Sequence, residues 1–248
     1  MNKVHLHKTG ITLSRCMQKL IQIGGLGLAL VSMPGQAQVD TTYSNSGTSS
    51  LNWNTPSEWT KSGPDDETVP TAQNHEANIT NTTHNRSVTV NLNDIHLGAF
   101  IFNASSTAQL QFRASGTRSV TFDKLTNDST ANLQFLNGTS SSLSLNIGNL
   151  EINTGSIEAG FNSTSATTLD KFEVSGTATI KAAARFHNSS GKTVKLGHLN
   201  LDGSNAVART STRNENGTIE VTTLTGNGVV ELAHSGSATR GDLIFNNP

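Results

Sequence analysis

Carboxylates are the residues of this chain best suited to chemistry, and their densest group is Asp65-Asp66-Glu67. A calcium site needs several oxygens at defined spacings. Three adjacent acidic residues in a Gly-Pro loop point in different directions, so we interpret the run as a solvated loop. The calcium-binding nonapeptide repeat, Gly-Gly-x-Gly-x-Asp, does not occur in the sequence.

Hydrolysis of a glycosidic bond requires a different arrangement of carboxylates. It needs two carboxyl groups about 5–9.5 Å apart, one of them with a raised pKa. Glu151 with Asp128, and Glu173 with Glu151, are pairs that stacked repeats would place on adjacent coils. Because stacking brings side chains this close without any chemistry, we favour a structural interpretation of both pairs.

The histidines and serines give no stronger signal. Six histidines lie beyond the N-terminal segment, and none has a partner at zinc-site spacing: His75, His84, His96, His187, His198 and His234. Gly197-His198 is similar to a Gly-His of pectin-hydrolysing β-helices, but the companion Asp pair and Arg-x-Lys are missing. A Ser/His/Asp triad stays open, although no Gly-x-Ser-x-Gly motif marks a nucleophile. We therefore predict no catalytic, cofactor-binding or metal-binding residue, and no enzyme.

Trp53, Trp59 and Tyr43 form the aromatic group of the N-terminal part of the chain. Exposed aromatic rings suit the faces of sugars, so these three residues are candidates for a carbohydrate platform. The alternative, which we favour, is that they close the end of a stacked fold. A stack needs such a cap because its first layer otherwise exposes strand edges and core side chains.

The elements that must position these residues repeat along the sequence. From about Ala108 onward, a unit of about two dozen residues contains a strand, a Gly/Asn/Ser turn, a second strand and a third. The first series of apolar positions is Leu110, Leu133, Ile157, Ile180, Val207 and Val230. The second is Val120, Leu143, Leu169, Val194, Ile219 and Leu243, and the third is Leu125, Leu150, Val174, Leu199 and Leu224.

This period predicts the fold. A unit so short cannot bury an apolar face alone, so successive units must stack. An antiparallel sandwich, the competing geometry, needs no fixed period. We therefore predict an all-β, right-handed parallel β-helix of about six or seven coils. Residues 38–86 would form an N-terminal segment and cap, and residues 87–248 the β-helix repeats, open at the C-terminal end.

The first 37 residues predict export. Lys3, Lys8, Arg15 and Lys19 form a basic segment, and an apolar run from Leu20 to Met33 follows. Small residues before Gln38 place signal-peptide cleavage after Ala37. Cleavage removes Cys16, the only cysteine, and four basic residues but no acidic one. The mature chain is thus more negative than the full chain, whose net charge is −1, and we expect no nucleic-acid partner.

The segment 51–103 resembles a known family. The matching residues are Trp53, Trp59, Gly63, Val69-Pro70-Thr71-Ala72, His75-Glu76-Ala77-Asn78-Ile79, Val88-Thr89-Val90 and Leu97-Gly98-Ala99-Phe100-Ile101-Phe102-Asn103. They are similar to the opening of bacterial autotransporter-type passenger domains with autotransporter-associated β-strand repeats. The resemblance implies an exported β-helical stalk at the cell surface or released from it. The sequence departs from the family by ending without its C-terminal barrel, so a truncated passenger, a split gene and another secretion route stay open.

Together these observations predict a secreted or cell-surface β-helical passenger or stalk with a structural or adhesive role. The alternatives are a β-helical polysaccharide lyase or hydrolase and a carbohydrate-binding module. Expected partners are surface glycans or receptors on host or neighbouring cells, with the outer membrane contacted only by association. An open edge around Leu243-Ile244-Phe245 predicts self-association.

Overall fold

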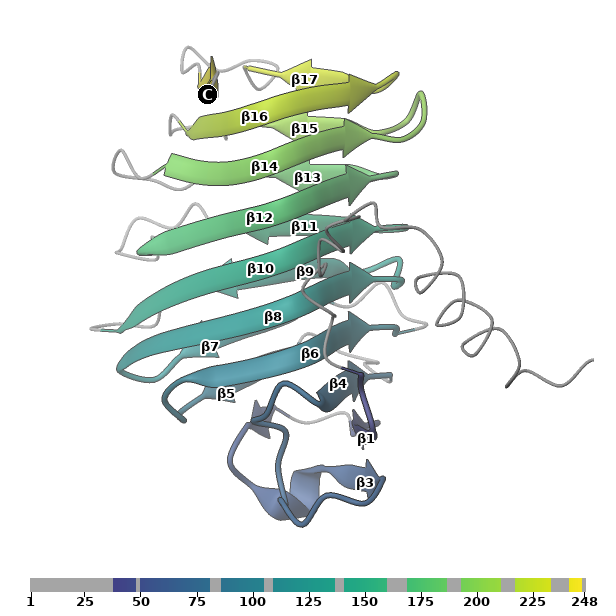
Figure 1. The fold of residues 1–248 in the computed structure, drawn as a ribbon, viewed down its shortest axis with the longest axis vertical. Coiled ribbons are helices and arrows are strands. Elements are labelled where there is room, and N and C mark those ends of the chain that lie inside the picture. Colours follow the sequence, from purple (N-terminus) through teal and green to yellow (C-terminus); the bar gives the residue numbers. More distant parts are fainter. Residues whose placement is uncertain are drawn as a thin grey trace, which may run out of the picture. The chain divides into compact units, whose positions relative to one another are not determined.

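Two sheets, parallel except for one strand, form the fold, and the chain passes from one to the other on each turn (Figure 1). The computed structural model describes residues 38–47, 50–80, 86–104, 109–136, 141–159, 169–186, 193–210, 217–232 and 241–246. These residues belong to one unit, 36–248. The expected signal peptide lies outside the described residues, as do His84, His187 and His234.

The first sheet, sheet A, contains the long strands. In sequence order they are β1 (Thr41–Asn45), β3 (Thr60–Ser62), β4 (His75–Ile79), β6 (Ile95–Phe102), β8 (Thr117–Asn127), β10 (Ser142–Ile152), β12 (Lys171–Ile180), β14 (Thr193–Leu201), β16 (Thr218–Gly226) and β18 (Asp242–Phe245). Each even-numbered strand from β4 to β18 is parallel to the next, and β1 is parallel to β4. Only β3 is antiparallel among the described strands, and it pairs with β1.

The second sheet, sheet B, contains shorter strands and is parallel throughout. They are β2 (Leu51–Asn52), β5 (Arg86–Val90), β7 (Leu110–Ala114), β9 (Asn132–Leu136), β11 (Ser156–Ala159), β13 (Ala183–Arg185), β15 (Val207–Arg209) and β17 (Val229–Glu231). A short 3-10 helix, η1 (Pro56–Glu58), follows β2. Among the described residues, no helix is long and apolar enough to cross a membrane.

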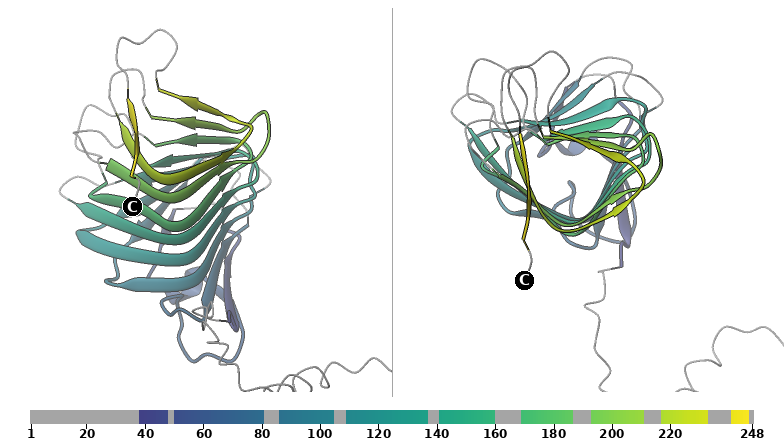
Figure 2. Two further views of the ribbon diagram at one scale, coloured as in Figure 1. Left: turned by 45° about the horizontal axis from the view of Figure 1, so that its top comes forward. Right: turned by 90° about the horizontal axis from the view of Figure 1, so that it is seen from above.

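The predicted all-β parallel β-solenoid is therefore confirmed, but it has about five turns and not the six or seven coils that we predicted. The prediction of three strands per turn is wrong, because the second and third strands form one long strand that turns a corner (Figure 2). In β10, inward residues alternate up to Ile147 and resume at Leu150. Gly148 and Asn149 between them both stay partly exposed, which marks the corner. Gly148 packs closely there, since a Cβ would lie 2.4 Å from the Asp123 carbonyl oxygen.

The three predicted series of apolar residues are correct in part. In sheet B, Leu110, Leu133 and Ile157 are in register with Ala184, Ala208 and Val230. The assignment of Ile180 and Val207 to this first series is therefore wrong. In sheet A, Leu145 and Phe172 replace Leu143 and Leu169, and Ala178 replaces Val174. Turns of unequal length and an extra residue in β12 shift the spacing. Three of the inward positions are occupied by alanine (Ala178, Ala184 and Ala208), which is too weakly apolar to mark them in the sequence.

Aromatic rings form a continuous column in the interior. Phe100 stacks on Phe122 with ring centroids 5.1 Å apart, and Phe112 packs edge-on against both. The column continues through Phe135, Phe172 and Phe186. Burial of these rings removes apolar surface from water along the part of the stack from the cap to Phe186, which stabilises the solenoid along its axis.

The tryptophans and Tyr43 close the N-terminal end of this column, as we favoured from the sequence. Trp53 and Tyr43 are fully buried. The Trp53 indole donates a 2.8 Å hydrogen bond to the Pro70 carbonyl, and the Trp59 indole donates one of 3.0 Å to the Trp53 carbonyl. Trp53 also contacts Phe100 and Phe112 of the core. These rings are therefore part of the interior and offer no exposed platform for a sugar.

Candidate functional site

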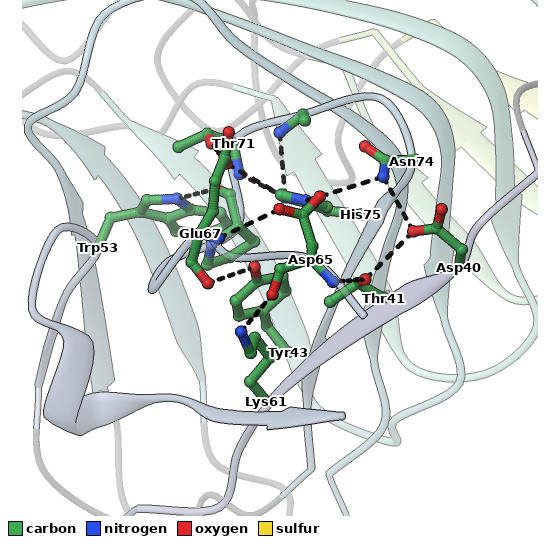
Figure 3. Close-up of polar contacts among 12 residues, drawn as sticks. Asp40, Thr41, Tyr43, Trp53, Lys61, Asp65, Glu67, Thr71, Asn74 and His75 are labelled. Carbon is green, nitrogen blue, oxygen red and sulfur yellow. Dashed lines mark hydrogen bonds and ion pairs between the residues drawn. The ribbon is translucent and has the colours of Figure 1, made fainter. Parts of the chain in front are cut away.

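A group of titratable residues joined by hydrogen bonds lies in this cap, around His75 of β4 (Figure 3). The His75 side chain is fully buried. Its Nδ1 accepts hydrogen bonds from the backbone N–H groups of Thr71 (3.1 Å) and Ala72 (3.2 Å). Since Nδ1 acts as an acceptor, Nε2 carries the proton and donates a 2.7 Å hydrogen bond to the Asp65 carboxylate. His75 is therefore in its neutral Nε2–H tautomer.

Asp65 organises the loop that leads to β4. Besides His75, its carboxylate accepts hydrogen bonds from the Asn74 amide (3.2 Å) and the Glu67 backbone N–H (3.1 Å). These bonds, that from His75 foremost, hold the pKa of Asp65 well below its usual range. The acidic run lies in a solvent-exposed loop, as we interpreted it, but its partly exposed Asp65 is also bonded to a buried partner, His75, ten residues away.

Tyr43 of β1 binds the same loop through its hydroxyl group. Its hydroxyl donates a 2.9 Å hydrogen bond to the Glu67 carbonyl, and its ring lies 4.9 Å from that of His75. Burial, aided by the nearby charges of Asp65 and Glu67, raises the pKa of Tyr43 to about 12. A tyrosine this hard to ionise is a poor general base. Each side chain of the cluster thus has a structural partner, and the cluster fastens the cap loop.

Carboxylates on the outer faces are also bound to neighbours. Glu151 forms an ion pair with Lys124 at 3.0 Å, and Glu173 one with Lys171 at 2.6 Å. Asp128 accepts a 2.7 Å hydrogen bond from Asn153. The register places Glu151 beside Thr126 and Thr179, whereas Glu173 lies beside Asn146. The proposed pair of Glu173 with Glu151 is therefore not brought together, and Glu151 and Asp128 each have a partner of their own.

The remaining described histidines lie apart from one another. His96 Nε2 is 2.8 Å from Asp123, and His198 Nε2 is 2.7 Å from the Thr225 hydroxyl. Within the described ranges, no group of three or more His, Cys, Asp or Glu residues is arranged to hold a metal ion. Gly197, the partner of His198 in the Gly-His pair, is a corner residue whose Cβ would lie 2.4 Å from the Ser175 carbonyl oxygen.

Among the described residues, two shallow hollows on the outer face of sheet A are candidates for a binding surface. The first has a volume of about 260 Å³ and lies across β12, β14, β16 and the residue after β18. Its outward-facing lining consists of Glu173, Ser175, Lys195, Gly197, Glu220, Thr222 and Asn246. The second has a volume of about 220 Å³ and is lined by Lys124, Asn149, Glu151, Thr177 and Thr179. Both are therefore polar and composed of side chains from successive turns.

Sequence reasoning missed two features of the polar structure. The contact between Asp65 and His75 depends on the path of a loop, which no periodicity reveals. Arg86 was detectable, because the alternation of Arg86, Val88 and Val90 places all three on the inner face of β5. Its guanidinium donates a 2.9 Å hydrogen bond to the Asn45 side chain, and burial lowers its pKa.

Comparison with known proteins gives no match: no protein-family model, no curated protein and no solved structure matches this chain. Its function therefore has to follow from its own residues and geometry.

Proposed function

We propose that this chain is an exported β-solenoid that serves as a structural or adhesive stalk at the cell surface or outside the cell. The observation that carries the proposal is the distribution of its side chains. A continuous apolar interior runs along the stack, and the outer carboxylates described above pair with lysine or asparagine instead of converging on one point. Such a molecule offers length and repeated polar contacts, which are the properties a stalk requires.

Export is the second part of the proposal. The basic segment, the apolar run from Leu20 to Met33 and the small residues before Gln38 support a cleaved signal peptide. The described fold starts soon afterwards, with β1 at Thr41. The resemblance of segment 51–103 to autotransporter-type passengers supports the same destination, and with it we propose right-handed winding, the usual hand of parallel crossovers.

Partners of the stalk would contact its outer faces. We propose surface glycans or receptors on host or neighbouring cells, with the outer membrane contacted only by association. Self-association through the last turn is supported by exposed apolar side chains. Among the described residues, the large exposed hydrophobic ones are Val229, Leu232, Ile244 and Phe245, all from β17 onward. Among the described strands, β17 and β18 are also the last in the two sheets, and an edge strand is a site for pairing with another chain.

Expression of the full chain with a C-terminal tag in a Gram-negative bacterium tests this proposal. We expect the mature protein to have the mass left by cleavage after Ala37 and to be accessible to protease added to intact cells or found in the medium. Beads coated with the secreted protein should adhere to cells more than beads coated with a protein of equal charge. An uncleaved chain that stays in the cytoplasm would refute export, and equal adhesion would refute the adhesive role.

A further inference from the structure

The outer face of sheet A contains one irregularity, a β-bulge in β12. The pairing of β10 with β12 shifts register between Ile147 and Leu150, where β12 has one additional residue. The same shift appears against β14, between Val174 and Thr177. The pairs β8–β10 and β14–β16 keep one register throughout. Bulges redirect side chains and are frequent next to functional sites.

Specific contacts hold this bulge in place. The Thr177 backbone N–H donates a 3.1 Å hydrogen bond to Oδ1 of Asn149, and the Ser175 hydroxyl lies 3.4 Å from the Ile147 carbonyl. Gly176 must be glycine here, because a Cβ would lie 2.6 Å from both Asn149 Oδ1 and the Gly148 carbonyl oxygen. Hydrogen bonds and close packing therefore fix the conformation of the bulge.

The two hollows lie on either side of the bulge. Ser175 lines the first, whereas Thr177 and Asn149 line the second. The bulge thus borders both hollows and lies between them. Both are shallow and polar, unlike the enclosed apolar pockets that bury most of a small ligand. Their form suits an extended ligand that lies along the surface.

The charges of this face decide the chemistry of that ligand. The carboxylates that line the two hollows lie beside lysines in three ion pairs, Lys124 with Glu151, Lys171 with Glu173 and Lys195 with Glu220. These pairs have no net charge, so the hollows have no electrostatic preference for a polyanion or a polycation. Carboxylate, ammonium, hydroxyl and amide groups are instead matched to the many hydroxyl groups of an uncharged sugar.

We propose that the face around the Ser175–Gly176 bulge binds an uncharged polysaccharide that lies across successive turns. Strand neighbours are about 4.8 Å apart, so the lining groups recur at short intervals along the stack. A polymer with repeated hydroxyl groups meets several such groups at once, and weak contacts add through multivalency. This inference rests on the adhesive part of the proposed function and names its ligand class.

Affinity electrophoresis and calorimetry of the purified full chain test this proposal. The probes are soluble dextran, galactomannan and arabinoxylan as uncharged polymers, with polygalacturonate as the charged one. The variant K195A/E220A removes one ion pair of the first hollow. The matched control is R209A/E231A, which removes an ion pair between β15 and β17 on sheet B. Circular dichroism verifies that both variants fold, and K195Q replaces the double variant if it does not.

We expect binding to at least one uncharged polymer, about tenfold weaker in K195A/E220A and unchanged in R209A/E231A. Binding should change little with salt, because counterion release makes no contribution. The proposal fails if no uncharged polymer binds, if both variants bind like the parent, or if polygalacturonate binds most tightly. Since the assay uses purified protein, its outcome is independent of export, and adhesion without polysaccharide binding would leave the stalk role standing.

Discussion

Phe122→Ala tests the continuous interior directly. Phe122 is fully buried and contacts Phe100 and Phe112, with ring centroids 5.1 Å and 6.0 Å away. Removing a buried phenyl ring costs about 3–5 kcal/mol, from lost transfer free energy and the cavity left behind. For a chain of this size we expect the melting temperature to fall by ~6–20 °C.

The chain itself provides a matched control for this substitution. Phe245 occupies the same inward series as Phe122, linked through Ile147, Val174, Leu196 and Val221. It is 56% exposed because it lies on the last described strand. Phe245→Ala should therefore lower the free energy of unfolding by less than about 1 kcal/mol.

Urea unfolding is the assay, followed by circular dichroism and by tryptophan fluorescence. Circular dichroism reports the whole sheet, whereas Trp53 and Trp59 report the cap. Phe122 lies close to the cap through Phe112, which is 5.7 Å from Trp53. Phe122→Ala should therefore shift both signals. Equal losses of stability in the two variants would refute the continuous apolar interior, because burial would then not determine the cost.

Three further predictions concern the corner and the cap. Gly148→Ala should lower stability by about 1–3 kcal/mol in urea unfolding, because its Cβ would lie 2.4 Å from the Asp123 carbonyl oxygen; unchanged stability would mean that the corner is loosely packed. Since the pKa of Asp65 is depressed in the folded chain, its stabilising effect is present above the unfolded value of about 3.9 and is lost as pH falls toward the folded value. Melting temperature should therefore fall more steeply on acidification in the parent than in Asp65→Asn, and parallel curves would contradict the role of this carboxylate. Tyr43 is the only tyrosine, so the ultraviolet absorbance of phenolate should give a midpoint of about 12 in the folded chain and about 10 in denaturant; a folded midpoint near 10 would place the hydroxyl in solvent.

The sequence predicted the parallel stack because one spacing recurs in several series of residues. It did not predict the long strands of sheet A, since a corner interrupts the alternation at Gly148 and Asn149. Two neighbouring outward residues look like a boundary between strands when only the sequence is read. Ala184 and Ala208 occupy inward positions where no strong apolar residue marks them.

The polar features were harder to predict, for different physical reasons. The partnership of Asp65 with His75 is set by a loop whose path follows no period. The bulge in β12 requires the register of both neighbouring strands, because the sequence Ser175-Gly176 by itself reads as a turn. Arg86 alone could have been assigned to the interior, from its alternation with Val88 and Val90.

The antiparallel strand β3 gives the molecule a direction. At its N-terminal side, sheet A ends in three exposed residues that run against β1, and the aromatic cap covers the interior. Another copy that joined sheet A from that side would have to pair with β3 instead of continuing the parallel ladder, which disfavours end-to-end filaments. Copies that meet through β17 and β18 would form a closed pair with both caps facing outward. Light scattering should then detect dimers at high concentration and no fibres.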